Sequence, residues 1–215
     1  MKKITLLLSI ALFSAGIIFT ACEKKDDTII ETTVGSVADE ALADTYWSSV
    51  DSDVDFVSDL MDGNGYKSVT DTCPMVIVEH PDSLFFPRTI TIDYGDEYCE
   101  THHGRLKKGR IIIHISDRIH LEGSVRTVTF EDYFINDYQI EGVKTLTNKG
   151  FNDSGNMNFD VTLTGGQITT PEGLAITRTI NHNREWILGI ETPRYWWDNE
   201  WLVRGTASGT NRDGV

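Results

Sequence analysis

The chain has 215 residues, of which 40% are hydrophobic and 24% charged, the balance of a globular protein rather than a disordered one. Nineteen Lys and Arg residues stand against 33 Asp and Glu, giving a formal net charge of −14. This charge argues against nucleic acid as a partner and against electrostatic adhesion to anionic lipid, because both need basic surfaces.

Residues 1–21 have the organisation of a secretory signal peptide. Lys2 and Lys3 form a positive start, and the apolar run over residues 4–19 is ~16 residues long, short of the ~20 that span a bilayer. The run ends at Phe19-Thr20-Ala21-Cys22, which resembles a lipobox. We therefore predict a lipid on Cys22 that anchors the mature protein in a membrane. A plain signal peptide is the alternative.

Residues 22–35 are predicted to form a flexible tether. It opens with Glu23-Lys24-Lys25-Asp26-Asp27. A lysine followed by two acidic residues after the lipidated cysteine resembles the surface-display signal of Bacteroidota lipoproteins. The resemblance implies an outer-membrane protein exposed outside the cell.

Two cysteines remain once Cys22 is assigned to the lipid. An exported protein folds in an oxidising space, so a disulfide between Cys73 and Cys99 is the natural hypothesis. Free buried thiols or a metal pair are the alternatives, although the chain has no CxxC spacing.

Residues 36–62 are predicted to form one helix. Val50, Val54, Val57 and Met61 recur at helical spacing and should form its buried face. Ser36 is the expected N-cap, with Asp39 completing a capping box, and a Gly-Asn-Gly sequence at 63–65 ends the helix.

Three further expectations concern the same helix. The apolar stripe should begin earlier, at Val37, Ala41 and Leu42. A break at residues 47–49 is the alternative to one continuous helix. The acidic face is expected to point to water; it consists of Asp44, Asp51, Asp53, Asp55 and Asp59.

After residue 66, short runs of alternating β-branched and aromatic residues are separated by turn clusters. The predicted strands are 89–94, 110–115, 124–134, 138–147, 158–164, 174–181, 185–190 and 200–206, with turns at 136–137, 165–166 and 171–173. Each strand can pair with its sequence neighbour. We therefore predict a mostly β fold, an antiparallel meander sheet packed with one N-terminal helix, as a single domain over residues 36–215.

The end of the sequence predicts an exposed edge. Residues 201–209 read as a strand, 211–214 as a hairpin turn, and Val215 as the first residue of a returning strand. We expect the natural protein to continue beyond this point, so that its last strands are missing here.

No pattern in the chain indicates catalysis. It contains no HExxH, GxSxG, SxxK or phosphate loop, so we expect no enzyme activity and no cofactor. Residues 93–103 combine carboxylates with His102 and His103, but their spacing does not match a calcium loop. A polar hairpin loop held by Cys99 is the preferred interpretation, metal binding is the alternative, and no metal site is predicted.

Aromatic residues give the best indication of a ligand. Trp186 and Trp201 lie within predicted strands and should pack in the core. Tyr195, Trp196 and Trp197 lie at a turn, where exposed indole rings can stack on sugar faces. These three are the predicted ligand-binding residues, with core or rim packing as the alternative.

Several stretches resemble a family of Bacteroidota surface lipoproteins for which no activity is established. They are TIDYG at 91–95 with Cys99, GRLKKGRI at 104–111, TFEDY at 129–133, IEGVKT at 140–145 and GTASG at 205–209. They cover most of residues 85–215, and the family's members are longer than this chain. The resemblance implies location and architecture, and it carries over no functional residue except Cys22.

Together these patterns predict a lipid-anchored envelope protein that binds a glycan or a host protein at the cell surface. The alternative is a structural or assembly component that contacts other envelope proteins.

Overall fold

The computed structural model describes residues 34–62, 73–79, 86–101, 104–191 and 198–215. All of them belong to one compact unit, Thr33–Val215. Within these ranges, no helix is long and apolar enough to cross a membrane. The elements are α1 (Val34–Asp62), β1 (Met75–Glu79), β2 (Arg88–Asp93), β3 (Cys99–Glu100), β4 (Leu106–Ile115), β5 (Val125–Ile135), β6 (Tyr138–Phe151), β7 (Met157–Thr169), β8 (Ala175–Leu188) and β9 (Glu200–Thr210).

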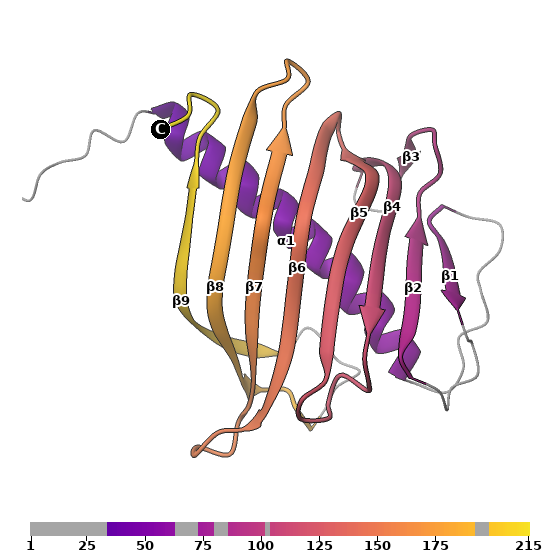
Figure 1. The fold of residues 1–215 in the computed structure, drawn as a ribbon, viewed down its shortest axis with the longest axis vertical. Helices are drawn as coiled ribbons and strands as arrows, with labels where there is room; N and C mark the ends of the chain where they lie inside the picture. The colour runs from indigo at the N-terminus through magenta and orange to yellow at the C-terminus, as the bar shows by residue number, and fades with distance from the viewer. Residues whose placement is uncertain (1–33, 63–72, 80–85, 102–103, 192–197) are drawn as a thin grey trace, which may run out of the picture. The chain divides into compact units, whose positions relative to one another are not determined.

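The strands form one antiparallel sheet in the order β1-β2-β4-β5-β6-β7-β8-β9, with the short β3 paired to β4 (Figure 1). The predicted mostly β meander with one helix is therefore confirmed. The two strands predicted at 174–181 and 185–190 are one long strand, β8. Both β1 and β3 were missed because they are only five and two residues long.

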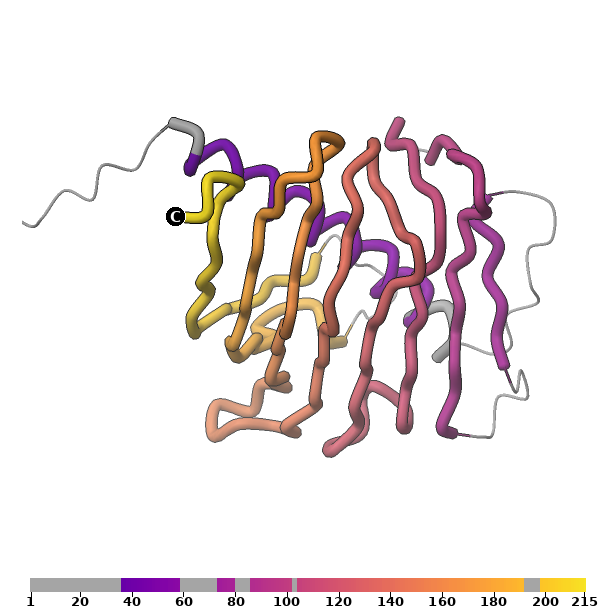
Figure 2. The backbone as a smooth tube through the Cα atoms, turned by 45° about the horizontal axis from the view of Figure 1, so that its top comes forward, coloured from indigo at the N-terminus to yellow at the C-terminus, as the bar shows by residue number. Residues whose placement is uncertain are grey.

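Helix α1 crosses one face of the sheet obliquely, from the side of β9 to the side of β2 (Figures 1 and 2). The buried face of the helix carries Ala43, Tyr46, Trp47, Val50, Val54 and Val57. It packs on isoleucines that alternate along β2 and β4 and on apolar residues of β5 to β8. Alternation places every second strand residue on this face, so β2 and β4 to β8 each contribute apolar side chains to the core.

Two expectations about the start of α1 were wrong. The helix begins at Val34, so Ser36 lies inside it, and Asp39 binds Arg212 instead of completing a capping box. Of the predicted early stripe, Leu42 packs against the core. Val37 is 57% exposed and Ala41 is also exposed, because the first turns of α1 lie near the sheet's β9 edge, where less of the sheet is beneath them. The helix continues without a break through residues 47–49.

A second apolar cluster fills the part of this sheet face where β8 and β9 curl toward the helix side (Figure 2). Trp186 is 5% exposed and stacks on Trp201 with ring centroids 5.0 Å apart. Trp201 also contacts Phe159, and the Arg184 guanidinium lies 3.9 Å from its ring centroid. Both tryptophans thus pack against the core, although Trp201 is only half-buried.

Two glycine- and asparagine-containing segments that were predicted as turns have different outcomes. Asn136 and Asp137 both have positive φ, 47° and 67°, as the two-residue turn between β5 and β6 requires. The turn predicted at 165–166 was wrong, because Gly165 and Gly166 lie inside β7 at a bulge. A Cβ on Gly142 would lie 2.9 Å from the Gly166 Cα, so these glycines allow β6 and β7 to approach closely.

Cys73 and Cys99 are joined by a disulfide, with Cα atoms 6.1 Å apart and a sequence separation of 26. It ties the segment before β1 to β3. Replacing Cys99 by serine is expected to lower the free energy of unfolding by about 2–4 kcal/mol, because the unfolded chain regains the freedom of the closed loop. Urea denaturation of Cys99→Ser and of the Cys73→Ser/Cys99→Ser double variant measures this. Equal stability of either variant and the parent chain contradicts the prediction.

Candidate functional site

Both flanks of α1 are fixed to the sheet by ion pairs, which we call the ionic seam. The pairs are Asp39 with Arg212, Glu40 and Asp44 with Arg178, Asp51 with Lys144, Asp53 with Lys107, and Asp55 with Arg126 and Arg184. The side chains of Lys107, Arg126 and Lys144 are only 3%, 8% and 11% exposed.

The ionic seam corrects the expectation that the acidic face of α1 points to water. Asp51, Asp53 and Asp55 instead bind cations that rise from inward-facing positions of β4, β5 and β6. Asp44 is more exposed but also pairs with the sheet, and the side chain of Asp59 lies outside the described residues. A buried lysine or arginine needs a nearby carboxylate, so the sheet determines which helix face is acidic.

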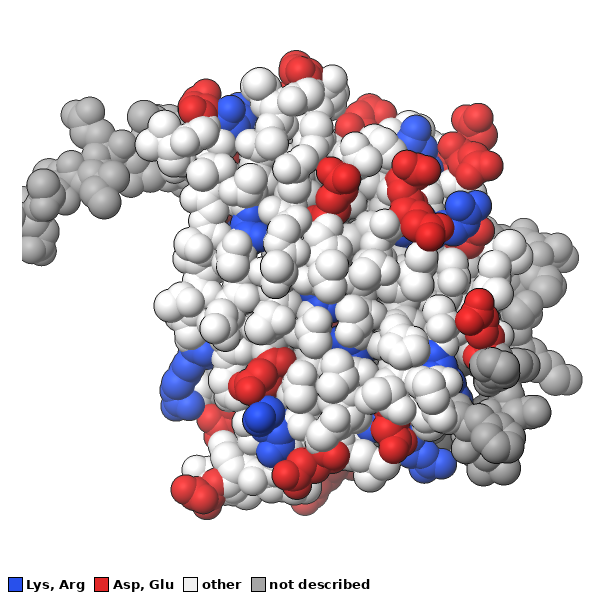
Figure 3. Space-filling model, in the orientation of Figure 1, with Lys and Arg blue, Asp and Glu red and all other residues white. Residues whose placement is uncertain are grey.

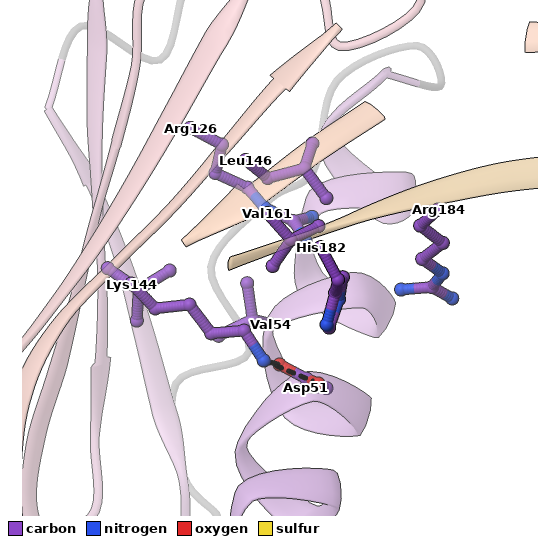
Figure 4. A pocket seen from close by; sticks show the side chains of 9 residues that line it. Asp51, Val54, Arg126, Lys144, Leu146, Val161, His182 and Arg184 are labelled. Atoms are coloured by element: carbon purple, nitrogen blue, oxygen red, sulfur yellow. Dashed lines mark hydrogen bonds and ion pairs between the residues drawn. The ribbon is translucent and has the colours of Figure 1, made fainter. Parts of the chain in front are cut away.

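Within the ionic seam lies a small cavity of about 30 Å³ between α1, β5, β6, β7 and β8 (Figure 4). The Lys144 Nζ lies 2.5 and 2.7 Å from the two carboxylate oxygens of Asp51 at its wall. The Arg126 Nη2 donates to Asp55 at 2.6 Å, while its Nε has no partner among the described residues. The volume admits roughly two water molecules and no organic ligand. We interpret this cavity as structural.

The ionic seam shifts the pKa values of three of its side chains, Asp39, Asp55 and Lys107. The side-chain hydrogen bond from Arg212 holds the pKa of Asp39 below its usual value, against the opposing effect of burial. Burial opposes ionisation of Asp55, but Arg126 and Arg184 outweigh it and its pKa is also lowered. Burial lowers the pKa of Lys107, and Asp53 partly offsets this. The carboxylates of Asp39 and Asp55 therefore favour the folded state above their unfolded pKa of about 4, and this contribution is lost as the pH falls through the folded pKa.

His182 at the cavity wall predicts a second pH dependence. Burial, then the nearby Lys144, lowers its pKa. Below the unfolded pKa of about 6.5, the unfolded chain binds a proton that the folded chain does not, so the free energy of unfolding should fall on acidification from this pH. His182→Gln should flatten the profile between pH 5 and 7 in urea denaturation. An unchanged profile contradicts the prediction.

The larger concavity is a groove of about 430 Å³ beside α1, which we call the polar groove. Its lining consists of Asp44, Thr45, Ser48, Ser49, Ser52, Asp53, Thr101, Arg105 and Lys107. The volume is in the range of small-molecule sites. All the lining residues are polar or charged, although carbon atoms make up much of the surface that they expose to the groove.

Two elements position the wall of the polar groove. Successive turns of α1 present Asp44, Ser48 and Ser52 at spacings of four, which places them on one helix face. The hairpin from β3 to β4 supplies Thr101 and Arg105; the Thr101 N–H donates to the Arg105 carbonyl at 2.8 Å. Arg105 forms no ion pair with a described residue. Hydroxyls can donate to and accept from the hydroxyl groups of a sugar, and a guanidinium can donate to its hydroxyl and carboxylate oxygens.

The sheet face opposite α1 carries few charges at its centre, and most acidic and basic side chains lie toward the strand ends (Figure 3). Cross-strand register places seven polar side chains in one row across it. They are Thr89, His114, Thr127, Thr145, Thr162, Asn181 and Thr206. Threonine suits exposed strand positions, so this row has a structural explanation.

Several residues singled out from the sequence lie outside the described residues: Cys22, His102, His103, Tyr195, Trp196 and Trp197. The structure therefore does not place the predicted aromatic ligand site. Among the residues that it does describe, no three His, Cys, Asp or Glu side chains are grouped to hold a metal ion.

The fold and groove define a helix-covered antiparallel sheet with a polar surface concavity. Comparison with known proteins adds no relative: no family model, no curated protein and no solved structure matches the chain.

Proposed function

We propose that this protein is a lipid-anchored binding module of the cell envelope, displayed at the surface of a bacterium of the Bacteroidota and taking a glycan in the polar groove. The observation that supports this most directly is the groove itself. Its volume of about 430 Å³ suits one or two sugar residues, and Thr45, Ser48 and Ser52 line it with hydroxyls. Arg105 adds a donor for sugar hydroxyls or for the carboxylate of an acidic sugar.

The anchor is tested separately from the ligand. In cells expressing the full chain, labelled palmitate should be incorporated and the protein should sediment with membranes. Cys22→Ser should abolish incorporation and release the protein from the membrane fraction. Cys99→Ser is the control, since it also removes a cysteine but leaves the lipid site. Labelled Cys22→Ser protein would contradict the anchor.

The ligand is tested by screening the chain carrying Cys22→Ser on an array of neutral and acidic glycans. Ser48→Trp fills the groove and should weaken binding by at least about tenfold, a loss of ~1.4 kcal/mol. Ala38→Trp is the matched control, because Ala38 is exposed on the same helix but does not line the groove. Binding that survives Ser48→Trp but is lost in Trp196→Ala/Trp197→Ala would move the site to the aromatic segment. No glycan bound would contradict the proposal.

The second candidate is an assembly component that contacts envelope proteins. It is favoured by one observation: β9 is an eleven-residue strand at the edge of the sheet with exposed side chains.

A further inference from the structure

The small cavity of the ionic seam contains a buried donor that lacks an acceptor. Arg126 rises from β5, and its side chain is only 8% exposed. Its Nη2 donates to Asp55 at 2.6 Å and its Nη1 to the Ser58 Oγ at 3.2 Å, but its buried Nε has no partner among the described residues. A buried N–H without an acceptor destabilises a fold, and more so when the group is ionised. Arg126 therefore requires an acceptor in the cavity that it lines.

Cations outnumber carboxylates around this cavity. Lys144 from β6 and Arg184 from β8 line it together with Arg126 (Figure 4). Asp51 is the only carboxylate among the described lining residues, and the Lys144 Nζ lies 2.5 and 2.7 Å from its two oxygens. Asp55 does not line the cavity but pairs with Arg126 at 2.6 Å and with Arg184 at 3.7 Å. Three cations thus share two carboxylates among the described residues, an excess of one positive charge.

The size and the remaining wall of the cavity favour a small anion. Apolar side chains from α1, β5, β6 and β7 form the rest of the lining, and the volume of about 30 Å³ holds one or two particles the size of water. A water molecule accepts from a donor but also needs acceptors for its own two protons, whereas Asp51 already accepts from Lys144 with both oxygens. A monatomic anion accepts from several donors at once and also supplies the missing negative charge, an attraction that a low-dielectric surrounding strengthens.

We propose that this cavity binds one chloride ion, which accepts from the Arg126 Nε and is attracted by Lys144 and Arg184. The surplus of carboxylates around Arg178 does not oppose the ion, because it lies about two to three turns earlier on α1 than Asp51 and does not line the cavity. The unfolded chain does not hold the three cations together, so the ion binds the folded state alone and stabilises it. Chloride thereby acts as a structural ligand of the contact between α1 and the sheet.

Urea denaturation of the chain carrying Cys22→Ser tests the proposal when sodium chloride replaces sodium gluconate at constant ionic strength. Gluconate is too large for the cavity, so it controls for screening. Each tenfold rise in chloride above its dissociation constant should raise the free energy of unfolding by ~1.4 kcal/mol. Arg184→Gln should reduce this dependence. Lys149→Gln is the matched control, since it also removes one positive charge, but from a half-exposed pair outside the cavity, and it should leave the dependence unchanged.

A second variant and a second measurement locate the ion. Val161→Ile adds one carbon to the cavity wall and leaves every charge in place, so it should abolish the chloride dependence in a folded protein. Crystals of the parent soaked in bromide should show an anomalous peak beside the Arg126 Nε, and crystals of Val161→Ile should not. Stability that is equal in chloride and gluconate would overturn the proposal, and a bromide peak accompanied by that result would be an adventitious ion only. Each outcome is independent of the glycan screen.

Discussion

Replacing Asp53 by leucine is expected to lower the free energy of unfolding by about 3–5 kcal/mol. The Lys107 side chain is 3% exposed beneath α1, and Asp53 is its only carboxylate partner among the described residues. The Tyr94 hydroxyl, which donates to Asp53 at 2.9 Å, also loses its acceptor. Removing one partner leaves a buried charge uncompensated, whereas the pair as a whole contributes little net stability.

Three measurements separate this explanation from simple loss of packing. In urea denaturation, Asp53→Leu/Lys107→Met should recover most of the loss, since no charge then remains buried. Lys149→Gln should change stability by no more than ~1 kcal/mol, because its pair with Asp160 is half exposed on both sides. The loss in Asp53→Leu should shrink as the pH rises toward about 10, where the unfolded chain also releases the Lys107 proton. A double variant as unstable as Asp53→Leu would contradict the explanation.

Replacing Trp47 by alanine is expected to cost about 3–5 kcal/mol. Trp47 is 3% exposed and lies in the centre of the helix–sheet interface, with its ring edge toward Phe130 at a centroid distance of 5.9 Å. The cost combines the lost burial of the indole with the cavity left between α1 and β5, which rigid strands cannot fill.

The same helix provides the control for Trp47. Phe56 is 63% exposed, so Phe56→Ala should change the free energy of unfolding by no more than about 0.5 kcal/mol. Equal losses in the two variants would mean that α1 does not dock as described.

The sequence predicted the sheet better than it predicted how the helix binds to it. Alternation located β2 and β4 to β9, and the spacing of Val50, Val54 and Val57 located the buried face of α1. The acidic face was misplaced because helix periodicity alone does not show what lies beneath a helix. The missing signal was in the strands: Arg126 is in phase with Val128, and Lys144 with Leu146, so both had to point inward.

The polar groove was not predicted because its two walls are far apart in the chain. Ser48 and Ser52 lie on α1, whereas Thr101 and Arg105 lie on the hairpin before β4. The helix side carried a signal, since Asp44, Ser48 and Ser52 recur at every fourth position as a narrow polar stripe. The strand side carried none, because a hairpin's position against a helix depends on the whole sheet register.

The oblique path of α1 also imposes an order on folding. The helix is the first described element to be synthesised, yet Asp39 must wait for Arg212, which lies 173 positions later, and Asp51 for Lys144, which lies 93 positions later. Native docking of α1 therefore requires almost the entire chain, and contacts of such long range make folding slow. Until Arg212 and Lys144 have been synthesised, Asp39 and Asp51 lack the cations that they bind in the folded protein.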